Sequence, residues 1–303
     1  MNDELPVRRR VDRVHGVLPL GPDEQVDDKA LVIPPTDPSL VDPFIALSED
    51  WFSRPGFNWH PHRGIETVTI VLDGALEHGD NRGCAGVLAP GDVQWMTAGS
   101  GIVHRELAFR DEHAHTLQLW VNLPAALKMT DARYQDLGAD RLATVTGPGT
   151  LVRAISGSAG DPAGDTAGDS AGGAVGPAEN HWPITGLMLT LEPTSSLTQP
   201  LPGPERAFLY VLSGRVRVGR DGTVLGRNQV AWSDPVGPDR SVLDLHAPDG
   251  DEVVRAVLFA GRPIGEPVVL GGSFVMNTAE QIAEAYRDFH AGRFGPVPNL
   301  ARR

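Results

Sequence analysis

The chain repeats part of itself, and this repeat constrains the fold more than any other feature of the sequence. The segment TIVLDGALEHG at residues 69–79 aligns with LYVLSGRVRVG at 209–219, at an offset of 140 residues. A second pair, LAPGDVQW at 88–95 and LGRNQVAW at 225–232, follows in the same order at an offset of 137, which indicates a shorter loop. We therefore expect two similar domains, covering residues 1–141 and 142–303.

Short apolar segments alternate with turn signals between residues 66 and 123. The dipeptides Asp73-Gly74 and Pro90-Gly91 and the run 99–101 separate these segments, with no amphipathic helical pattern between them. The 35 glycines and 26 prolines also favour many short strands over long helices. Strands at such regular spacing predict an all-β sandwich or barrel, because closure protects the strand edges.

Two segments depart from the strand pattern. Residues 156–179 are rich in Gly, Ala and Asp, with little to bury, and predict a mobile loop inserted near the start of the second domain. Near the C-terminus, Thr278 and Gln281 fit a capping box, and Gly292 suits a helix stop. One docking helix is predicted over residues 278–291, with an apolar face formed by Ile282, Tyr286 and Phe289.

Charge and composition exclude several classes of protein. The formal net charge of −13 repels polyanions, so direct nucleic-acid binding is not expected, and the basic cluster at residues 8–13 is interpreted as a solvated terminus. The single cysteine, Cys84, forms no intrachain disulfide. The sequence contains no signal-peptide core and no long apolar run, which predicts a cytoplasmic chain that does not bind membranes. Two barrels that cover each other's edges favour a monomer over a dimer.

Histidines concentrate in the first half of the chain, and two short motifs stand out. They are HPH at 60–62 and HRE at 104–106. Residues i and i+2 of a strand point to the same face, so His60 with His62, and His104 with Glu106, can present two ligands each. Two adjacent strands can then hold one metal ion. Three imidazoles and a carboxylate suit Fe(II), Mn(II), Ni(II), Cu(II) or Zn(II), and a six-coordinate ion retains two open positions for oxygenase chemistry.

For the remaining polar and aromatic residues near these motifs, we predict roles other than metal binding. His78, His113 and His115 lack a partner at the same spacing and are interpreted as surface or supporting residues. Strand alternation points Arg63 and Arg105 away from the metal, toward the outer face. We expect Gln118 to hydrogen-bond inside the barrel, and we expect core packing for Trp95 and Met96.

The second copy of the repeat provides an internal control for the metal site. An offset of 140 places Pro200 and Pro202 opposite His60 and His62, and an offset of 137 places Ser241 and Leu243 opposite the later pair. No candidate ligand is retained at these positions. The second domain is therefore predicted to be metal-free.

Several longer segments resemble the pirin family of the cupin superfamily. They are HPHRGIETVTIVLDGALEH from residue 60, GVLAPGDVQWMTAGSGIVHRE from 86 and LQLWVNLP from 117, with VDPFIALSEDW from 41 and GGSFVMNTAEQIAEAYRDF from 271. The resemblance implies a bicupin of two antiparallel, jelly-roll-like β-barrels with a short C-terminal helix. It also implies one mononuclear iron in the N-terminal domain, at the positions His60, His62, His104 and Glu106.

The family resemblance implies more than one activity. Some members resemble flavonol 2,3-dioxygenases, which open quercetin with O2 and release carbon monoxide, and others act as regulators. Our leading hypothesis is a quercetin dioxygenase-like enzyme with one Fe(II) per chain, a flavonol-like substrate and Glu106 as catalytic base. Mn, Ni, Cu, Co or Zn are alternative metals. The alternative function is a non-enzymatic, metal- or redox-dependent protein that binds an enzyme or transcription regulator. A zinc-stabilised structural protein and an isomerase-type cupin rank below both.

Overall fold

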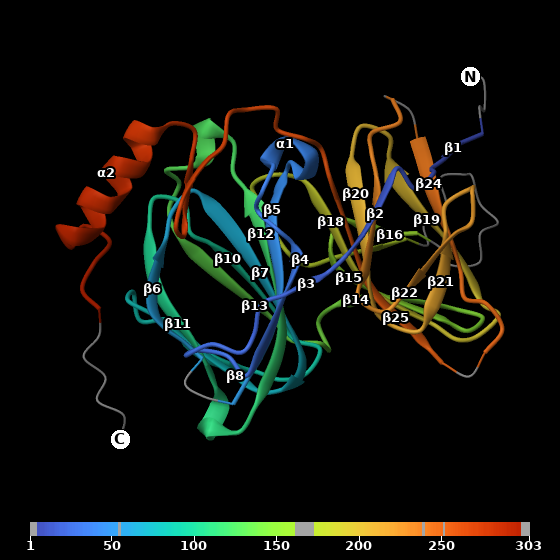
Figure 1. The fold of residues 1–303 in the computed structure, drawn as a ribbon, viewed down its shortest axis with the longest axis horizontal. Coiled ribbons are helices and arrows are strands. Elements are labelled where there is room, and N and C mark those ends of the chain that lie inside the picture. The colour runs from blue at the N-terminus through green and yellow to red at the C-terminus, as the bar shows by residue number, and fades with distance from the viewer. Residues whose placement is uncertain (1–4, 54–55, 161–172, 238–239, 251, 298–303) are drawn as a thin grey trace. The chain divides into compact units, whose positions relative to one another are not determined.

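The computed structural model describes residues 5–53, 56–160, 173–237, 240–250 and 252–297 (Figure 1). The chain divides into two compact units. One unit, called the first barrel, comprises Leu18–Asp140 and Ile264–Arg303. The other, called the second barrel, comprises Met1–Val17 and Arg141–Pro263.

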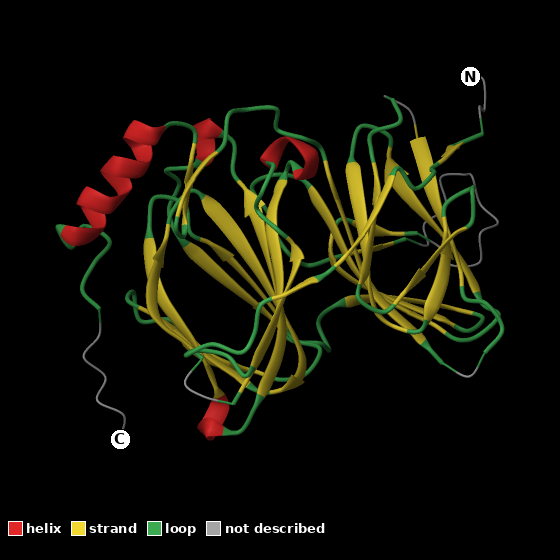
Figure 2. Cartoon of the chain, viewed as in Figure 1, coloured by secondary structure: helices red, strands yellow, loops and turns green. Residues whose placement is uncertain are grey.

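The first barrel is built from two antiparallel sheets (Figures 1 and 2). The larger sheet has the order β13 (Arg133–Leu137), β10 (Val93–Thr97), β7 (Ile65–Gly74), β12 (Ala114–Asn122), β5 (Phe44–Phe52), β4 (Asp28–Ile33) and β3 (Leu18–Pro19). The smaller sheet has the order β6 (Phe57–His62), β11 (Ile102–Ala108), β8 (Leu76–Asp80) and β9 (Ala85–Leu88).

The second barrel repeats this strand order. Its larger sheet runs β2 (Arg13–Gly16), β23 (Gln229–Ser233), β20 (Arg206–Ser213), β25 (Val254–Gly261), β18 (Ile184–Leu191), β15 (Thr150–Ser156) and β14 (Ala143–Gly147). In its smaller sheet β24 (Arg240–His246) pairs with β19 (Ser196–Pro202), β21 (Arg215–Val218) and β1 (Val7–Arg8), and β21 pairs with β22 (Thr223–Gly226). The aligned segments of the sequence repeat thus form equivalent strands, and the predicted all-β, two-barrel fold is confirmed.

We predicted two domains that divide the chain at residues 141 and 142. In the structure, each terminal segment lies in the opposite unit from the one predicted. The boundary near residue 140 agrees, but the N-terminal segment belongs to the second barrel and the C-terminal segment to the first. The reason lies in strand pairing. Strand β2 lies beside β23, the place that β13 takes beside β10, so a strand from the N-terminus completes the second barrel.

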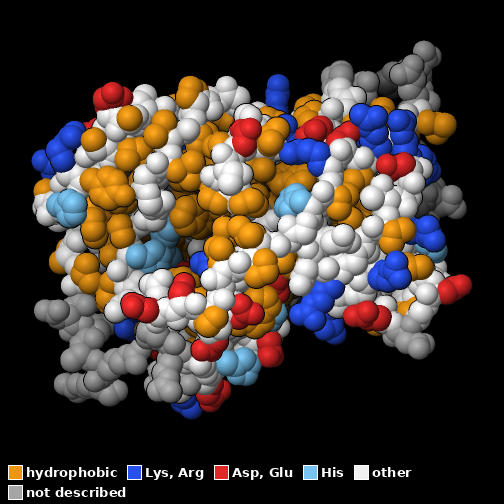
Figure 3. All heavy atoms as spheres, in the orientation of Figure 1, with side chains coloured by type: hydrophobic (Ala, Val, Ile, Leu, Met, Phe, Trp, Pro, Cys, Tyr) orange, Lys and Arg blue, Asp and Glu red, His pale blue; other side chains and the backbone are white. Residues whose placement is uncertain are grey.

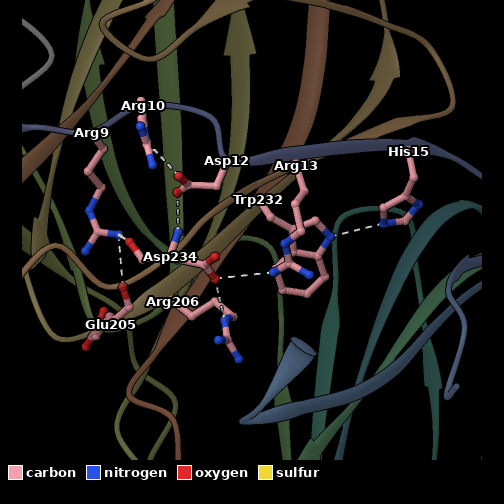
Figure 4. A network of polar contacts seen from close by, with 9 residues as sticks. All are labelled: Arg9, Arg10, Asp12, Arg13, His15, Glu205, Arg206, Trp232 and Asp234. Carbon is pink, nitrogen blue, oxygen red and sulfur yellow. Dashed lines mark hydrogen bonds and ion pairs between the residues drawn. The ribbon is translucent and has the colours of Figure 1, made fainter. Parts of the chain in front are cut away.

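The N-terminal segment is a strap on the second barrel rather than a solvated terminus (Figure 4). The Arg9 side chain is fully buried and donates hydrogen bonds to Ser241 Oγ at 2.7 Å, the Pro202 carbonyl at 2.7 Å and the Glu205 carbonyl at 2.9 Å. Further along the strap, Trp232 Nε1 donates to His15 Nε2 at 3.0 Å. Figure 3 shows Lys and Arg side chains at the surface of this barrel. The neighbouring Arg8 is exposed and pairs with Asp244. One of the predicted surface charges is therefore an interior anchor.

The predicted insertion at 156–179 is ordered at both flanks. Short strands β16 (Ser158–Ala159) and β17 (Ala174–Val175) pair antiparallel, and Ala159 is fully buried within the apolar core of the second barrel. The expectation of a loop with nothing to bury is therefore wrong for these flanks, because the small alanine side chain fills space between strands. Residues 161–172, in the middle of the insertion, lie outside the described residues.

The C-terminal helix α2 (Ala279–His290) follows the predicted signals. Thr278 caps it, both hydrogen bonds of the capping box with Gln281 are present, and Gly292 has a φ of +71° just beyond its end. Ile282 and Phe289 of the predicted apolar face pack against the cluster that contains Ala285. Tyr286 is 40% exposed, and the most buried positions of the helix are Ala285 and Asp288. Helix α2 packs on the first barrel beside β26 (Val269–Gly271) and β27 (Phe274–Met276).

The remaining helical segments are single turns. They are α1 (Pro38–Val41), η1 (Phe109–Asp111) and η2 (Ala125–Leu127). In the part of the chain that the structure describes, every helix is too short or too polar to cross a lipid bilayer.

The interiors of the two barrels differ in polarity. One continuous aliphatic cluster fills the second barrel, including Leu187, Leu189, Leu209, Val211, Leu243 and Leu258. The first barrel instead encloses many polar side chains among the described residues, including Thr67, Thr69, His78, Gln94, His104 and Glu106. Buried polar groups cost free energy unless they are satisfied or used, so the first barrel is the one to search for a site.

Candidate metal centre

Two adjacent strands bring three imidazoles together inside the first barrel. Strands β6 and β11 pair antiparallel, in a register that places His60 opposite His104 and His62 opposite Ile102. Cross-strand partners share a face of the sheet, so all three imidazoles lie on one side. Their ligand atoms lie within 4.8 Å of one another, and their ring centroids are 4.3 to 5.0 Å apart.

Hydrogen bonds fix the proton position on two of the three rings. His60 Nδ1 lies 2.7 Å from the Asn58 carbonyl oxygen, and His62 Nδ1 lies 3.3 Å from the Ser273 carbonyl oxygen. A carbonyl only accepts, so each Nδ1 carries the proton and each Nε2 keeps its lone pair. Carbonyl groups that hold the second ring nitrogen are a common support for metal-binding histidines.

Three of the remaining ring nitrogens are buried and unpaired among the described residues. His62 Nε2 and both ring nitrogens of His104 are enclosed without a hydrogen-bond partner. Burial lowers the pKa of His60 and lowers those of His62 and His104 well below the ordinary value, so the rings are neutral. Neutral imidazoles with free lone pairs are the form that binds a metal, so this group of residues fits a divalent ion.

Glu106 lies on the same strand but outside this cluster. Within the described parts of the chain, the group of close ligand atoms contains the three imidazoles and no carboxylate. A β-bulge separates His104 from Glu106 in the pairing with β6. Gln118 Nε2 donates to Glu106 Oε2 at 2.7 Å and Thr69 Oγ1 donates to Oε1 at 3.1 Å. Gln118 therefore hydrogen-bonds inside the barrel, and its partner is Glu106, the predicted fourth ligand.

Burial is the main influence on the Glu106 carboxyl. It raises the pKa of Glu106, and the hydrogen bonds from Gln118 and Thr69 oppose that rise. A carboxylate with a raised pKa is a stronger base than an exposed one.

A second polar chain lies beside Glu106. His78 on β8 is opposite Glu106 in register and is 1% exposed, so of the two predicted roles, surface residue or supporting residue, the surface role is wrong. Its Nε2 hydrogen-bonds Asp136 Oδ2 at 3.1 Å, and Gln94 Nε2 donates to Asp136 Oδ1 at 2.8 Å. Gly86 leaves the space for this contact, because a Cβ there would lie 2.7 Å from His78 Nε2.

The other histidines lie apart from the cluster. His113 is exposed and pairs with Asp73 at 3.0 Å. His115 hydrogen-bonds Glu49 at 2.7 Å and stacks on Trp51.

The two arginines beside the cluster are covered by neighbouring side chains. The side chain of Arg63 is 5% exposed and forms an ion pair with Asp288 on α2, because the C-terminal segment covers the strand there. Arg105 pairs with Glu77 at 2.7 Å and lies over the Trp59 ring. Trp95 and Met96 are fully buried, and Met96 packs in an apolar cluster with Ile45 and Ile65.

The second-barrel positions that the repeat places opposite the histidines point elsewhere. Pro200 and Pro202 lie on the exposed side of β19, and the buried side carries Gln199 and Leu201. The constant offset therefore fails by one residue in this strand. Leu243, the position opposite Glu106, lies in the aliphatic core.

Two antiparallel barrels with the same strand order, one of them with converging imidazoles inside, define a bicupin with a candidate metal centre in one barrel. Residues 35–121 match the family model described as Pirin, and residues 186–295 match that of the Pirin C-terminal cupin domain. The chain belongs to the pirin family. It is 36% identical to human pirin over 267 residues, which cover 84% of this chain and 83% of that protein.

Similarity extends to plant and bacterial proteins. Pirin-like protein 2 of Arabidopsis thaliana is 36% identical over 269 residues, covering 86% of this chain and 78% of that protein. Among solved structures, quercetin 2,3-dioxygenase from Acinetobacter baumannii superposes with a TM-score of 0.83 at 28% identity, covering 96% of this chain and 100% of that one.

Proposed function

We propose that the protein is a mononuclear metal-dependent dioxygenase that cleaves quercetin or a related flavonol with O2. The observation that carries the proposal is the set of converging neutral imidazoles inside a polar barrel, with His62 and His104 buried and His60 half-buried. Similarity to a structure named quercetin 2,3-dioxygenase supports the choice of substrate class.

One Fe(II) per chain is the proposed metal, with Mn, Ni, Cu, Co and Zn as alternatives. His60, His62 and His104 would hold it, and Glu106 is the proposed fourth ligand. A bound Fe(II) would supply Lewis acidity toward a substrate oxygen and a path for electrons to O2.

Glu106 is the proposed base for the substrate's hydroxyl proton. Its Oε atoms accept hydrogen bonds from Gln118 and Thr69, which orient the carboxylate within the barrel. The raised pKa of Glu106 suits a group that takes a proton from a phenolic hydroxyl and holds it. Gln118 limits that rise by stabilising the ionised form, so we infer that Gln118 tunes the strength of the base.

Oxygen consumption tests the proposal directly. Anaerobically Fe(II)-loaded protein should take up O2 in step with quercetin loss over many turnovers, and the metal-free protein should not. Glu106→Gln should lower turnover by about 100-fold or more, because the amide accepts no proton. Glu77→Gln changes a carboxylate of the neighbouring strand that pairs with Arg105, and it should retain turnover.

Two results would contradict this assignment. Full turnover by Glu106→Gln would remove Glu106 as base. Absence of O2 uptake by protein that carries bound iron would favour the alternative function, a metal- or redox-dependent protein that binds an enzyme or regulator.

A further inference from the structure

The C-terminal arm, defined here as residues 264–295, lies directly on the strand that carries two of the three clustered imidazoles. The Ser273 carbonyl accepts the hydrogen bond from His62 Nδ1 at 3.3 Å, and Ser273 Oγ donates to the carbonyl of Pro61. Val275 N donates to the carbonyl of Arg63 at 3.0 Å. The residues on both sides of His62, and its ring, are therefore each bonded to the arm.

A buried ion pair fastens helix α2 to the same place. Arg63 Nη1 donates to Asp288 Oδ2 at 2.9 Å, with side-chain exposures of 5% and 11%. Arg63 Nε also donates to the carbonyl of Ser100 at 2.7 Å. The Phe294 ring covers the guanidinium at 4.6 Å. Removing one member of such a pair leaves a buried charge uncompensated, so the contact specifies where α2 lies.

The turn after Arg63 also packs closely against the arm. Gly64 has a φ of +82°, and a Cβ there would lie 2.0 Å from the Val275 carbonyl oxygen. The buried Lys128 ammonium donates to the carbonyl oxygens of Gly64 and Val275, both at 2.9 Å, and to Asn122 Oδ1 at 2.7 Å. The three donors of the ammonium are thereby used to join strand β6, the arm and the end of β12.

These contacts bear on metal affinity through the position of one ring. A metal site binds tightly when its ligands are held in place before the ion arrives, and the partner of the second imidazole nitrogen sets ring orientation and tautomer. For His62, that partner is supplied by the arm rather than by the barrel strands.

We propose that the C-terminal arm is a positioning element of the metal centre, and that Ser273 and Asp288 are positioning residues for His62. The arm sets the affinity of the centre for its metal without contributing a ligand. The inference rests on the proposed metal centre and is independent of flavonol cleavage.

Cobalt binding by the full-length protein tests this proposal. Co(II) alone is the probe, its dissociation constant is measured by chelator competition, and its visible ligand-field spectrum reports ligand geometry. We expect Asp288→Asn and Ser273→Ala to raise the dissociation constant by about 10-fold each and to shift the spectrum. Glu284→Gln is the matched control, because Glu284 is an exposed carboxylate on the same helix as Asp288. It should bind Co(II) as the unaltered protein does.

Stability measured in parallel separates positioning from general support. Ser273→Ala keeps the carbonyl that accepts from His62 Nδ1 and removes the hydroxyl that fastens Ser273 to Pro61. It is expected to fold even if Asp288→Asn does not. A lower unfolding temperature with unchanged Co(II) affinity and spectrum in Ser273→Ala would overturn the proposal. An equal loss of affinity in Glu284→Gln would also overturn it. If the unaltered protein and His60→Ala bound Co(II) equally, the proposed metal centre itself would fall, and the arm's role with it.

Discussion

At the scale of single residues, two enclosed cations are held by main-chain oxygens rather than by carboxylates. Arg9 donates to the carbonyls of Pro202 and Glu205, and Lys128 to those of Gly64 and Val275. Each side chain joins segments that are distant in the sequence. Neither contact is visible in a hydrophobicity pattern, in which both residues are simply charged.

Stability should depend on pH through Glu205, which lies near Arg9. Burial raises the pKa of the Glu205 carboxyl from 4.5 to about 7, and Arg9 opposes part of that rise. The folded state therefore keeps a proton that the unfolded state releases, so the free energy of unfolding falls as the pH rises from 4.5 to about 7. The fall should be at most about 3 kcal/mol.

Urea unfolding at pH 5 and pH 8 measures this effect. Glu205→Gln should lose most of the difference between the two pH values, whereas Glu252→Gln, at an exposed position of the same barrel, should keep it. An unchanged pH dependence in Glu205→Gln would assign the titration to another group.

The clustered imidazoles were predictable from local sequence because strand alternation is a local rule. HPH places two rings on one face whatever the rest of the chain does, and antiparallel pairing with HRE adds a third. The burial of His78 was not predictable in this way. Its partners Gln94 and Asp136 come from other strands, and only the register of the sheets brings them together.

At the scale of elements, the turn between β6 and β7 should be the most sensitive glycine position near the site. Gly64→Ala must place a side chain at positive φ and against the Val275 carbonyl, and we expect a loss of at least about 3 kcal/mol. Gly83→Ala, at a φ of +98° with open space around it, isolates the backbone effect and should cost about 1 kcal/mol. Urea unfolding of the two variants gives the comparison, and equal losses would show that the close approach is unimportant.

Strand and helix signals were read correctly where they are local. The turn dipeptides delimit the strands of the first barrel, and the Thr278 capping box starts α2. The sequence did not predict that the N-terminal segment belongs to the second barrel and the C-terminal segment to the first. Strand β2 pairs with β23 more than 200 positions along the chain, and no periodicity within residues 13–16 identifies that partner.

At the scale of the whole molecule, one topology holds two different interiors. The second barrel fills its centre with aliphatic side chains, whereas the first encloses His62, His104 and Glu106, which an apolar core excludes. Stability in the first barrel is therefore expected to depend on its ligand, and stability in the second on packing.

Metal binding should raise stability in a site-dependent way. With free Fe(II) at 100 times the dissociation constant, the folded state gains about 2.7 kcal/mol. Calorimetry of the metal-loaded and metal-free proteins should show this as a higher unfolding temperature, and His60→Ala should show little rise. An equal rise in His60→Ala would locate the stabilising ion elsewhere.

Strand β2 has a consequence for the order in which the protein is made. It is translated before its neighbour β23, which follows some 200 residues later. The first barrel likewise waits for the arm that holds His62. Neither barrel can finish folding as its own first strands emerge, so each remains open to chaperones and proteases until its distant partner segment has been translated. The proposed metal centre would therefore gain its full support for His62 only after the arm has been made.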